Sequence, residues 1–340
     1  MNINNFDFTL PKKNIAQVPK KSRSSSKLLV INRATGELTN DKFDNIDEYI
    51  TKNDLIVVND TKVIPARLFG FRNKTNGKVE ILVERIICEK TFICQLKSTR
   101  KLKKDDVIIV GKNIKLLVEN NSNELVKIRI LNSTSEDVFL NYGLIPLPPY
   151  IQREPNDIDK KYYQTIFANK SGSVAAPTAA LHFDNNVLNK LRDKGITISN
   201  VTLHIGMGTF SPIKTNNINQ HKMHEERYQV SESTVEQIRK CKLRKGRVVA
   251  VGTTVTRALE SYYNNNNKNP EKFYETDIFI KPGYNFKVVD HLVTNFHLPK
   301  SSLLVMISAF YDTKKILEAY KFAIENDYKF FSYGDASIIL

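Results

Sequence analysis

The chain has no tryptophan, only three cysteines and no long apolar run. Cys88, Cys94 and Cys241 show neither a metal-ligand spacing nor a disulfide framework, which is typical of proteins from a reducing compartment. Cys88 and Cys94 lie in strand-like runs, so we expect both thiols in the core. No apolar run approaches the roughly 18 residues that cross a membrane, and the first residues lack a signal-peptide core. We therefore expect a cytoplasmic protein.

Acidic residues are too few to balance the basic ones. The 340 residues include 51 Lys and Arg against 36 Asp and Glu, which gives a formal net charge of +15. A surface of this sign attracts polyanions, and nucleic acid is the commonest of them. Lys and Asn are abundant throughout, however, so charge alone is equally compatible with a compositional bias spread over solvated faces. The length is sufficient for a full core and two domains.

Short β-rich segments follow one another between Gly70 and the proline-rich stretch at 146–149. Turn residues such as Asn76-Gly77 and Gly111 separate them, which predicts a small all-β barrel or sandwich. The five segments cover 78–87, 91–96, 107–110, 114–118 and 125–131. A buried strand is predicted before them at 55–58, and the polar motifs come after them. The β-rich domain is therefore predicted to be an insertion that divides a larger domain.

Strands and helices alternate after residue 150, which indicates a main domain of the α/β or α+β class. Asp184 is suited to cap one helix, and Ser233 with Glu236 forms a capping-box signature before another. An apolar strand at 248–251 leads into a helix over 255–262.

The segment VTLHIGMG at 201–208 ends a predicted strand with two glycines. The strand period of two places His204 on the face opposite Leu203, away from the apolar side. Gly206 and Gly208 allow a ligand to approach the backbone closely, or supply positive φ. No dinucleotide fingerprint is formed, because a serine takes its third glycine position. A glycine turn beside a hydrogen-bonded core histidine explains the same pattern.

The turn Gly252-Thr253-Thr254 lies at the start of the predicted helix. Backbone N–H groups at such a position favour a carboxylate or a phosphate. Arg257, one turn into the helix, would add a bidentate donor. A threonine N-cap with Arg257 in a structural ion pair is the alternative interpretation.

The segment HKMHEERY carries His221, His224 and Glu225, which invites a metal-binding interpretation because residues three apart share a helix face. The H-E-x-x-H order is absent, and the segment lacks a third ligand. That ligand would have to be His182, His204 or His297. We therefore expect no metal, and we expect His224 and Glu225 to act as acid/base or ligand-binding groups.

Two further polar groups stand out. Asn59-Asp60-Thr61 follows the 55–58 strand, where open sheets present ligand groups, although Asp60 is also suited to cap a turn and pair with Arg67. A dense basic cluster in the β-rich domain would suit phosphate contacts, although a solvated loop is its usual explanation and aromatic residues are few around it. The cluster consists of Lys97, Arg100, Lys101, Lys103 and Lys104.

Long motifs spread from Phe6 to Ile338 resemble one protein family. They include FDFTLP, VVNDTKVIPARLFG, LPPYI, GSVAAPTAALHF, VTLHIGMGTF, MHEERY, VGTTVTRALES, FIKPGY, TNFHLPKS and FFSYGD. The family is S-adenosylmethionine:tRNA ribosyltransferase-isomerase, of the queuosine pathway. The chain departs from its pattern at Ala180, where glycine is usual, at Val255-Thr256, where Ser-Val is usual, and at Ser337, where methionine is usual.

The resemblance implies a barrel-like α/β main domain of residues 1–69 and 146–340, with a small Greek-key barrel-like β domain inserted at 70–145. It implies transfer of the ribosyl group of S-adenosylmethionine to 7-aminomethyl-7-deazaguanine at the tRNA wobble position. The products would be epoxyqueuosine, adenine and methionine. S-adenosylmethionine is then a co-substrate, with no tightly bound cofactor and no metal, and we expect a monomer.

The resemblance also suggests roles for individual residues. His204, His224 and His297 are the acid/base candidates, and Asp60 and Glu225 would orient or bind. Asn295 and Asp335 would contact adenine or ribose hydroxyls, and Arg23, Arg257 and Lys300 would contact anions. Further substrate-binding candidates are Asn59, Arg67, Thr178, His182, Gly206, Gly208, Thr209, Thr253, Thr254 and Tyr333.

Two other classes of function stay open at this point. One is a metal-dependent hydrolase built on the histidines. The other is a tRNA-binding protein that has lost catalysis through the departures at Ala180 and Val255-Thr256.

Overall fold

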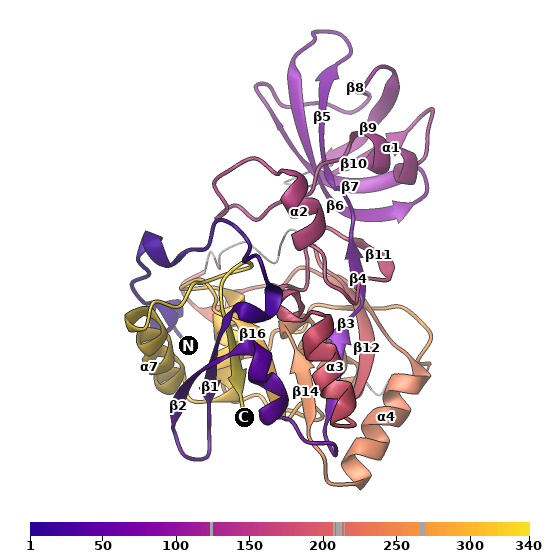
Figure 1. The fold of residues 1–340 in the computed structure, drawn as a ribbon. Helices are drawn as coiled ribbons and strands as arrows, with labels where there is room; N and C mark the ends of the chain where they lie inside the picture. Colours follow the sequence, from indigo (N-terminus) through magenta and orange to yellow (C-terminus); the bar gives the residue numbers. More distant parts are fainter. Residues whose placement is uncertain (123–124, 207, 209–212, 214, 266–268) are drawn as a thin grey trace.

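The computed structural model describes residues 1–340 except 123–124, 207, 209–212, 214 and 266–268. Figure 1 shows two parts: a large sheet flanked by helices, which contains both termini, and a β-barrel above it. Among the described residues, no helix has the length and apolar character needed to cross a membrane.

The large sheet has nine strands in the order β15-β13-β12-β3-β14-β16-β17-β1-β2. Its strands are β1 (Lys27–Ile31), β2 (Leu38–Lys42), β3 (Leu55–Asn59), β12 (Thr197–His204), β13 (Glu226–Val230), β14 (Val248–Val251), β15 (Tyr274–Thr276), β16 (His291–Asn295) and β17 (Ala336–Ile339). Four central neighbours, β12, β3, β14 and β16, are parallel. Their carboxyl ends therefore meet at one edge, where open α/β sheets commonly bind ligands.

Both faces of the central strands are covered. Leu55 and Val57 of β3 join one apolar cluster, and Ile56 and Val58 join another on the opposite face. A strand buried on both faces has a continuous apolar sequence, which is why its sequence shows no alternation.

The helices of this part are α2 (Asp157–Tyr162), α3 (Asn185–Asp193), α4 (Glu232–Leu243), α5 (Thr253–Asn264), α6 (Ser302–Phe310) and α7 (Thr313–Glu325). Short 3-10 helices are η1 (Ile3–Phe6), η2 (Lys12–Asn14), η3 (Arg23–Ser25), η4 (Phe43–Glu48), η5 (Thr178–His182) and η7 (Ile218–Gln220).

Six antiparallel strands close into the barrel in the order β10-β7-β6-β5-β8-β9. They are β5 (Arg67–Arg72), β6 (Lys78–Cys88), β7 (Thr91–Ser98), β8 (Val107–Val110), β9 (Ile114–Ser122) and β10 (Leu125–Ile130), and α1 (Ser135–Tyr142) packs beside them. The barrel has its own apolar core. A two-stranded pair, β4 (Thr61–Val63) with β11 (Lys170–Ser173), lies where the chain passes between the two parts.

The structure confirms the five predicted β segments and the Asp184 cap, which accepts a hydrogen bond from the Val187 amide at 3.1 Å. It adds a sixth barrel strand, β5, which was not predicted from the sequence. The Greek-key detail and the boundaries 69/70 and 145/146 stay predictions.

Three expectations were wrong. The large sheet is not barrel-like, because among the described strands it has two edges, β15 and β2. Ser231, rather than Ser233, caps α4 by accepting a hydrogen bond from the Thr234 amide. Cys88 is exposed, because it is the last residue of β6 and extends past the barrel core.

Candidate functional site

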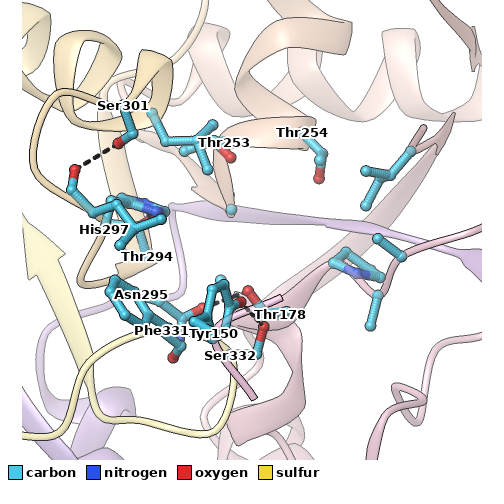
Figure 2. Close-up of a pocket in the computed structure, with 18 of the residues that line it drawn as sticks. Tyr150, Thr178, Thr253, Thr254, Thr294, Asn295, His297, Ser301, Phe331 and Ser332 are labelled. Atoms are coloured by element: carbon cyan, nitrogen blue, oxygen red, sulfur yellow. Dashed lines mark hydrogen bonds between the residues drawn. The ribbon is translucent and has the colours of Figure 1, made fainter. Parts of the chain in front are cut away.

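Two cavities lie at the carboxyl edge of the parallel strands. The inner pocket is formed by the start of α5, the end of β16 with the loop after it, η5 and the 331–332 segment. Figure 2 shows Thr253 and Thr254 on one side of this pocket, with Tyr150, Thr178 and Ser332 on the other. The interdomain cleft lies between the carboxyl-terminal end of the barrel strand β6 and the segment 221–227. Ile205 lines both cavities, so they adjoin.

The two cavities differ greatly in size. The inner pocket measures about 90 Å³ and the interdomain cleft about 970 Å³. The inner pocket therefore suits a small ligand or one part of a larger one, whereas the cleft suits a bulky substrate. Barrel residues line the cleft but are not among the residues that line the inner pocket.

A hydrogen-bonded chain runs behind the inner pocket from Ser26 to Thr178. The Asn295 amide nitrogen donates to His182 Nε2 at 3.0 Å and to the Phe331 carbonyl at 3.2 Å, and its oxygen accepts from Thr178 Oγ1 at 2.8 Å. Because an amide nitrogen only donates, His182 Nε2 accepts and Nδ1 carries the proton that points to Ser26 Oγ, 2.8 Å away. Burial lowers the pKa of His182 to about 4, so the ring is neutral at pH 7.

His297 lines the inner pocket next to the end of β16. Its Nε2 lies 3.0 Å from Thr294 Oγ1, and its backbone N–H donates to the Tyr320 hydroxyl at 3.1 Å. Burial lowers the pKa of His297 to about 3. The imidazole is therefore neutral at pH 7.

Asn59 ties three elements together at the same edge. Its amide nitrogen donates to the Leu203 carbonyl at 3.0 Å and to Thr254 Oγ1 at 3.3 Å, and its oxygen accepts from the Leu203 N–H at 3.0 Å. Thr254 is thereby held at the pocket wall. The residue next to it, Asp60, is buried and accepts from Thr202 Oγ1 at 2.6 Å and Asn200 Nδ2 at 2.7 Å.

Asp60 is not among the residues that line either cavity. The alternative interpretation, in which Asp60 pairs with Arg67, was wrong: Arg67 Nε donates to Glu80 in the barrel at 2.8 Å. The reason is topological, because β5 carries Arg67 into the barrel while Asp60 stays at the end of β3.

The start of α5 has no side-chain cap. Gly252 occupies the N-cap position with φ of 96°, so the alternative of a threonine N-cap was wrong. Thr253 and Thr254 face the inner pocket from the first turn (Figure 2). The N–H groups of this turn are positioned to receive an anionic ligand group.

Arg257 forms a buried ion pair with Glu226 through Nη1, and each residue is only 4% exposed. Arg257 Nε and Nη2 are also buried, and they have no hydrogen-bond partner within the described residues. Buried unpaired donors are costly. Arg257 is thus a structural ion-pair partner with two further donors still available.

Gly206 and Gly208, the two glycines after β12, do not have positive φ; their lack of a side chain instead allows other groups to approach closely. The Gly206 N–H donates to Glu226 Oε1 at 3.3 Å, and the Gly208 N–H donates to Glu84 Oε1 at 3.1 Å. A methyl group at Gly208 would overlap the His224 ring. Glu84 belongs to β6, so this loop joins the barrel to the sheet. Thr209 lies outside the described residues.

The remaining candidates of the cleft come from the sheet side. His204 Nδ1 lies 2.8 Å from Thr61 Oγ1, and its ring stacks on Phe273. Burial, with Arg227 and Lys170 nearby, lowers the pKa of His204 to about 4. His224 and Glu225 line the same cleft and are exposed.

In the part of the chain that the structure describes, no three His, Cys, Asp or Glu side chains are grouped so that they could hold a metal ion.

Four residues that were predicted to contact ligands make contacts within the chain, and their ligand contacts stay predictions. Lys300 Nζ pairs with Asp7 at 2.8 Å, and Tyr333 donates to Asp159 at 2.7 Å. Arg23 donates to three backbone carbonyls, those of Lys161, Gln164 and Leu181, and lines a small third cavity beside His182 and Tyr333. Asp335 accepts from Lys20 and from the amides of Lys27 and Lys329.

Several site residues were not predicted individually. Tyr150, Phe331 and Ser332 line the inner pocket, and Tyr150 and Ser332 hydroxyls lie 2.5 Å apart. They belong to the motifs LPPYI and FFSYGD, which offered a signal. Glu226 belongs to MHEERY in the same way. Glu84 lies in an ordinary barrel strand, and its sequence gave no indication of a role.

These features define a two-part protein whose cleft separates a β-barrel from the carboxyl edge of a mixed sheet. Residues 3–339 match the family model described as queuosine biosynthesis protein. The chain is 48% identical to S-adenosylmethionine:tRNA ribosyltransferase-isomerase of Coxiella burnetii (98% of this chain, 97% of the relative) and 46% identical to that of Sulfurihydrogenibium sp. (100% of each). The crystal structure of S-adenosylmethionine tRNA ribosyltransferase from Thermotoga maritima is similar, with a TM-score of 0.58, 32% identity and coverage of 99% and 100%. The chain belongs to the queuosine biosynthesis protein family, and it is a transferase.

Proposed function

We propose that this enzyme transfers and isomerises the ribosyl group of S-adenosylmethionine onto 7-aminomethyl-7-deazaguanine at the wobble position of tRNA. Adenine and methionine leave, and the tRNA carries epoxyqueuosine. The observation that supports this most directly is that a small inner pocket and a large interdomain cleft share Ile205 in their linings. Such neighbouring cavities suit a small-molecule group and a nucleic acid that react with each other. We propose further that the enzyme acts as a monomer in the cytoplasm.

The inner pocket supplies groups suited to S-adenosylmethionine. The uncapped start of α5, with Thr253 and Thr254, is placed to bind the methionine carboxylate. Thr178 has its hydroxyl hydrogen committed to Asn295, so its oxygen presents only lone pairs to the pocket. Thr178 therefore suits a ligand donor such as a ribose hydroxyl or an adenine amino group.

The chemistry requires a base and an acid. The sulfonium acidifies the neighbouring 5′ carbon, where a base removes a proton, an acid assists the departure of adenine, and the neutral amine of the deazaguanine attacks. His297 lines the inner pocket and His204 lines the cleft, so both are candidates for the base. Burial lowers the pKa of each, so both rings are in the neutral form at pH 7. His224 and Glu225 are exposed in the cleft, where the tRNA base would enter.

Neither alternative class of function gains support. The departures from the family pattern at Ala180, Val255 and Thr256 are buried and are not among the residues that line the inner pocket. The core therefore accommodates these side chains without a change in the residues that form the pocket wall. Thr256 Oγ1 donates to the Gly252 carbonyl at 3.3 Å, within its own helix.

One experiment tests the proposal. The protein is incubated with S-adenosylmethionine and tRNA bearing the deazaguanine precursor, with and without a chelator. We expect equimolar adenine and methionine together with the modified nucleoside in both samples. Activity that the chelator abolishes and zinc restores would favour the metal-dependent hydrolase, and tRNA binding without adenine release would favour the inactive binding protein.

A further inference from the structure

Two aromatic side chains are exposed on the outer face of the barrel. Phe69 and Phe71 are 47% and 44% exposed, and they alternate along β5 with the buried Leu68 and Gly70. Residues two apart in a strand lie on the same face. Large apolar rings placed together on a surface mark an interaction site more often than isolated ones do.

The rings border a groove lined with basic side chains. Strand register places Phe71 opposite Lys78, and Phe69 opposite Glu80, which in turn lies opposite Lys97. Glu80 is the one acidic group in the groove lining that the structure describes, and Arg67 pairs with it at 2.8 Å. The Arg67 guanidinium also lies over the Phe69 ring, 5.0 Å from its centroid.

The basic loop predicted to contact tRNA lies beside the same strand. Arg72, the residue after Phe71, donates to the Arg100 carbonyl and lies 3.8 Å from Asp106. Leu102 is buried and anchors the loop from within. Its exposed cations form no ion pair with the described residues; they are Arg100, Lys101, Lys103 and Lys104. The sequence offered no aromatic residues within this cluster, but the fold brings two from β5.

We propose that this aromatic-basic face binds single-stranded nucleotides of the tRNA that flank the wobble position. Bases would stack on Phe69 and Phe71, and phosphates would contact Lys78, Lys97 and the basic loop. Single-stranded RNA is the favoured occupant, because a ring can stack only on a base whose face is bare. The inference rests on the proposed function.

The position of the face suits such a substrate. Strand β6 carries Lys78 and Glu80 in the groove and Glu84 to Cys88 in the interdomain cleft. At about 3.3 Å per residue, Lys78 and Glu84 are about 20 Å apart along the strand. One RNA loop can therefore contact both places while its wobble base enters the cleft.

The absence of tryptophan makes a direct binding test possible. A Phe71→Trp variant carries one fluorophore on the face, and Leu140→Trp, at a position 70% exposed on α1, is the matched control. A synthetic anticodon stem-loop RNA should quench the first variant saturably and leave the second unchanged. A fully paired RNA of equal length should compete poorly. Equal quenching of both variants, or equal competition by the duplex, would overturn the proposal.

Kinetics give a second, independent measurement. The Phe69→Ala/Phe71→Ala variant should raise the KM for tRNA at least about tenfold, with kcat, the KM for S-adenosylmethionine and the melting temperature unchanged. Leu140→Ala should change none of these. An unaltered KM for tRNA in the double variant would sink the inference. So would a concentration-dependent dimer of the wild type that the double variant abolishes, because the face would then join two copies of this chain.

Different results would contradict the proposed function and the proposed RNA contact at the aromatic-basic face. Quenching of the Phe71→Trp variant needs no turnover, so it reports RNA binding even if no adenine is released. Absence of adenine release by the wild type would defeat the proposed function. Normal release with no quenching and an unchanged KM would defeat the aromatic-basic face alone.

Discussion

The side-chain amide of Asn295 donates a hydrogen bond to Nε2 of His182 at 3.0 Å, and this contact sets the direction of the whole chain from Ser26 to Thr178. Asn295→Ala should leave the Thr178 hydroxyl and the buried His182 nitrogen without partners. We expect a loss of about 1–3 kcal/mol in the free energy of unfolding, measured by denaturant titration. Thr178→Val, which removes one hydroxyl and keeps the shape, should mainly raise the KM for S-adenosylmethionine. If both variants lost stability equally, Thr178 would have a structural role only.

The buried histidines make stability depend on pH. Burial lowers the pKa of His182, His204 and His291 to about 4 and that of His297 to about 3. In the unfolded chain the histidine pKa is near 6.5, so between about pH 6.5 and pH 4 the unfolded chain binds more protons than the folded chain. The contribution of these histidines to the free energy of unfolding is therefore fully present above about pH 6.5 and is lost as the pH drops toward 4.

Denaturant midpoints at pH 7, 6 and 5 measure this loss. His182→Gln should flatten the dependence, because it removes one of the groups that only the unfolded chain protonates. A midpoint that is constant from pH 7 to 5 would contradict the burial of these rings.

The buried Arg257–Glu226 pair separates stability from ligand binding. Arg257→Ala removes the guanidinium that pairs with the buried Glu226 carboxylate, and breaking such a pair costs about 3–5 kcal/mol of unfolding free energy. The double variant Arg257→Met/Glu226→Gln should recover most of that stability, because both charges of the pair are then removed together. If Nε and Nη2 of Arg257 bind the ligand, the refolded double variant should still show a raised KM for S-adenosylmethionine. An unchanged KM would assign the arginine to the fold alone.

His297 carries the strongest catalytic prediction. General acid–base participation contributes about 10² to 10⁴ in rate, so His297→Ala should bind both substrates and release adenine at least a hundredfold more slowly. His291→Gln, at a second buried histidine that is not among the residues lining either cavity, is the control and should keep the wild-type rate. Near-normal turnover of His297→Ala would transfer the role to His204 or His224.

The basic loop should control the salt dependence of tRNA binding. Each phosphate neutralised on single-stranded nucleic acid contributes about −0.7 to the slope of log affinity against log salt. Replacing Lys101, Lys103 and Lys104 by alanine should therefore reduce the slope by about 2, without affecting S-adenosylmethionine. A wild-type affinity that is the same at about 50 and 200 mM salt would rule out phosphate contacts altogether.

Features that depend on neighbouring residues could be predicted from the chain alone. The five barrel segments, the Asp184 cap and the strand at Val248–Val251 follow from side-chain periodicity and capping chemistry, which act over a few residues. The motifs were long enough to indicate the family and hence the expected reaction. They also placed Thr178, Asn295 and His297 among the candidates, and these do line one pocket.

Partnerships between distant residues were decided by the tertiary structure. Arg257 with Glu226, Arg67 with Glu80 and Lys300 with Asp7 depend on strand order and on the docking of the barrel, neither of which short-range periodicity encodes. Phe69 and Phe71 are a further case, since β5 brings them beside a basic loop that begins about thirty residues later. Local chemistry selects each element, but burial, charge pairing and the shape of a site arise only when elements far apart in the chain pack together.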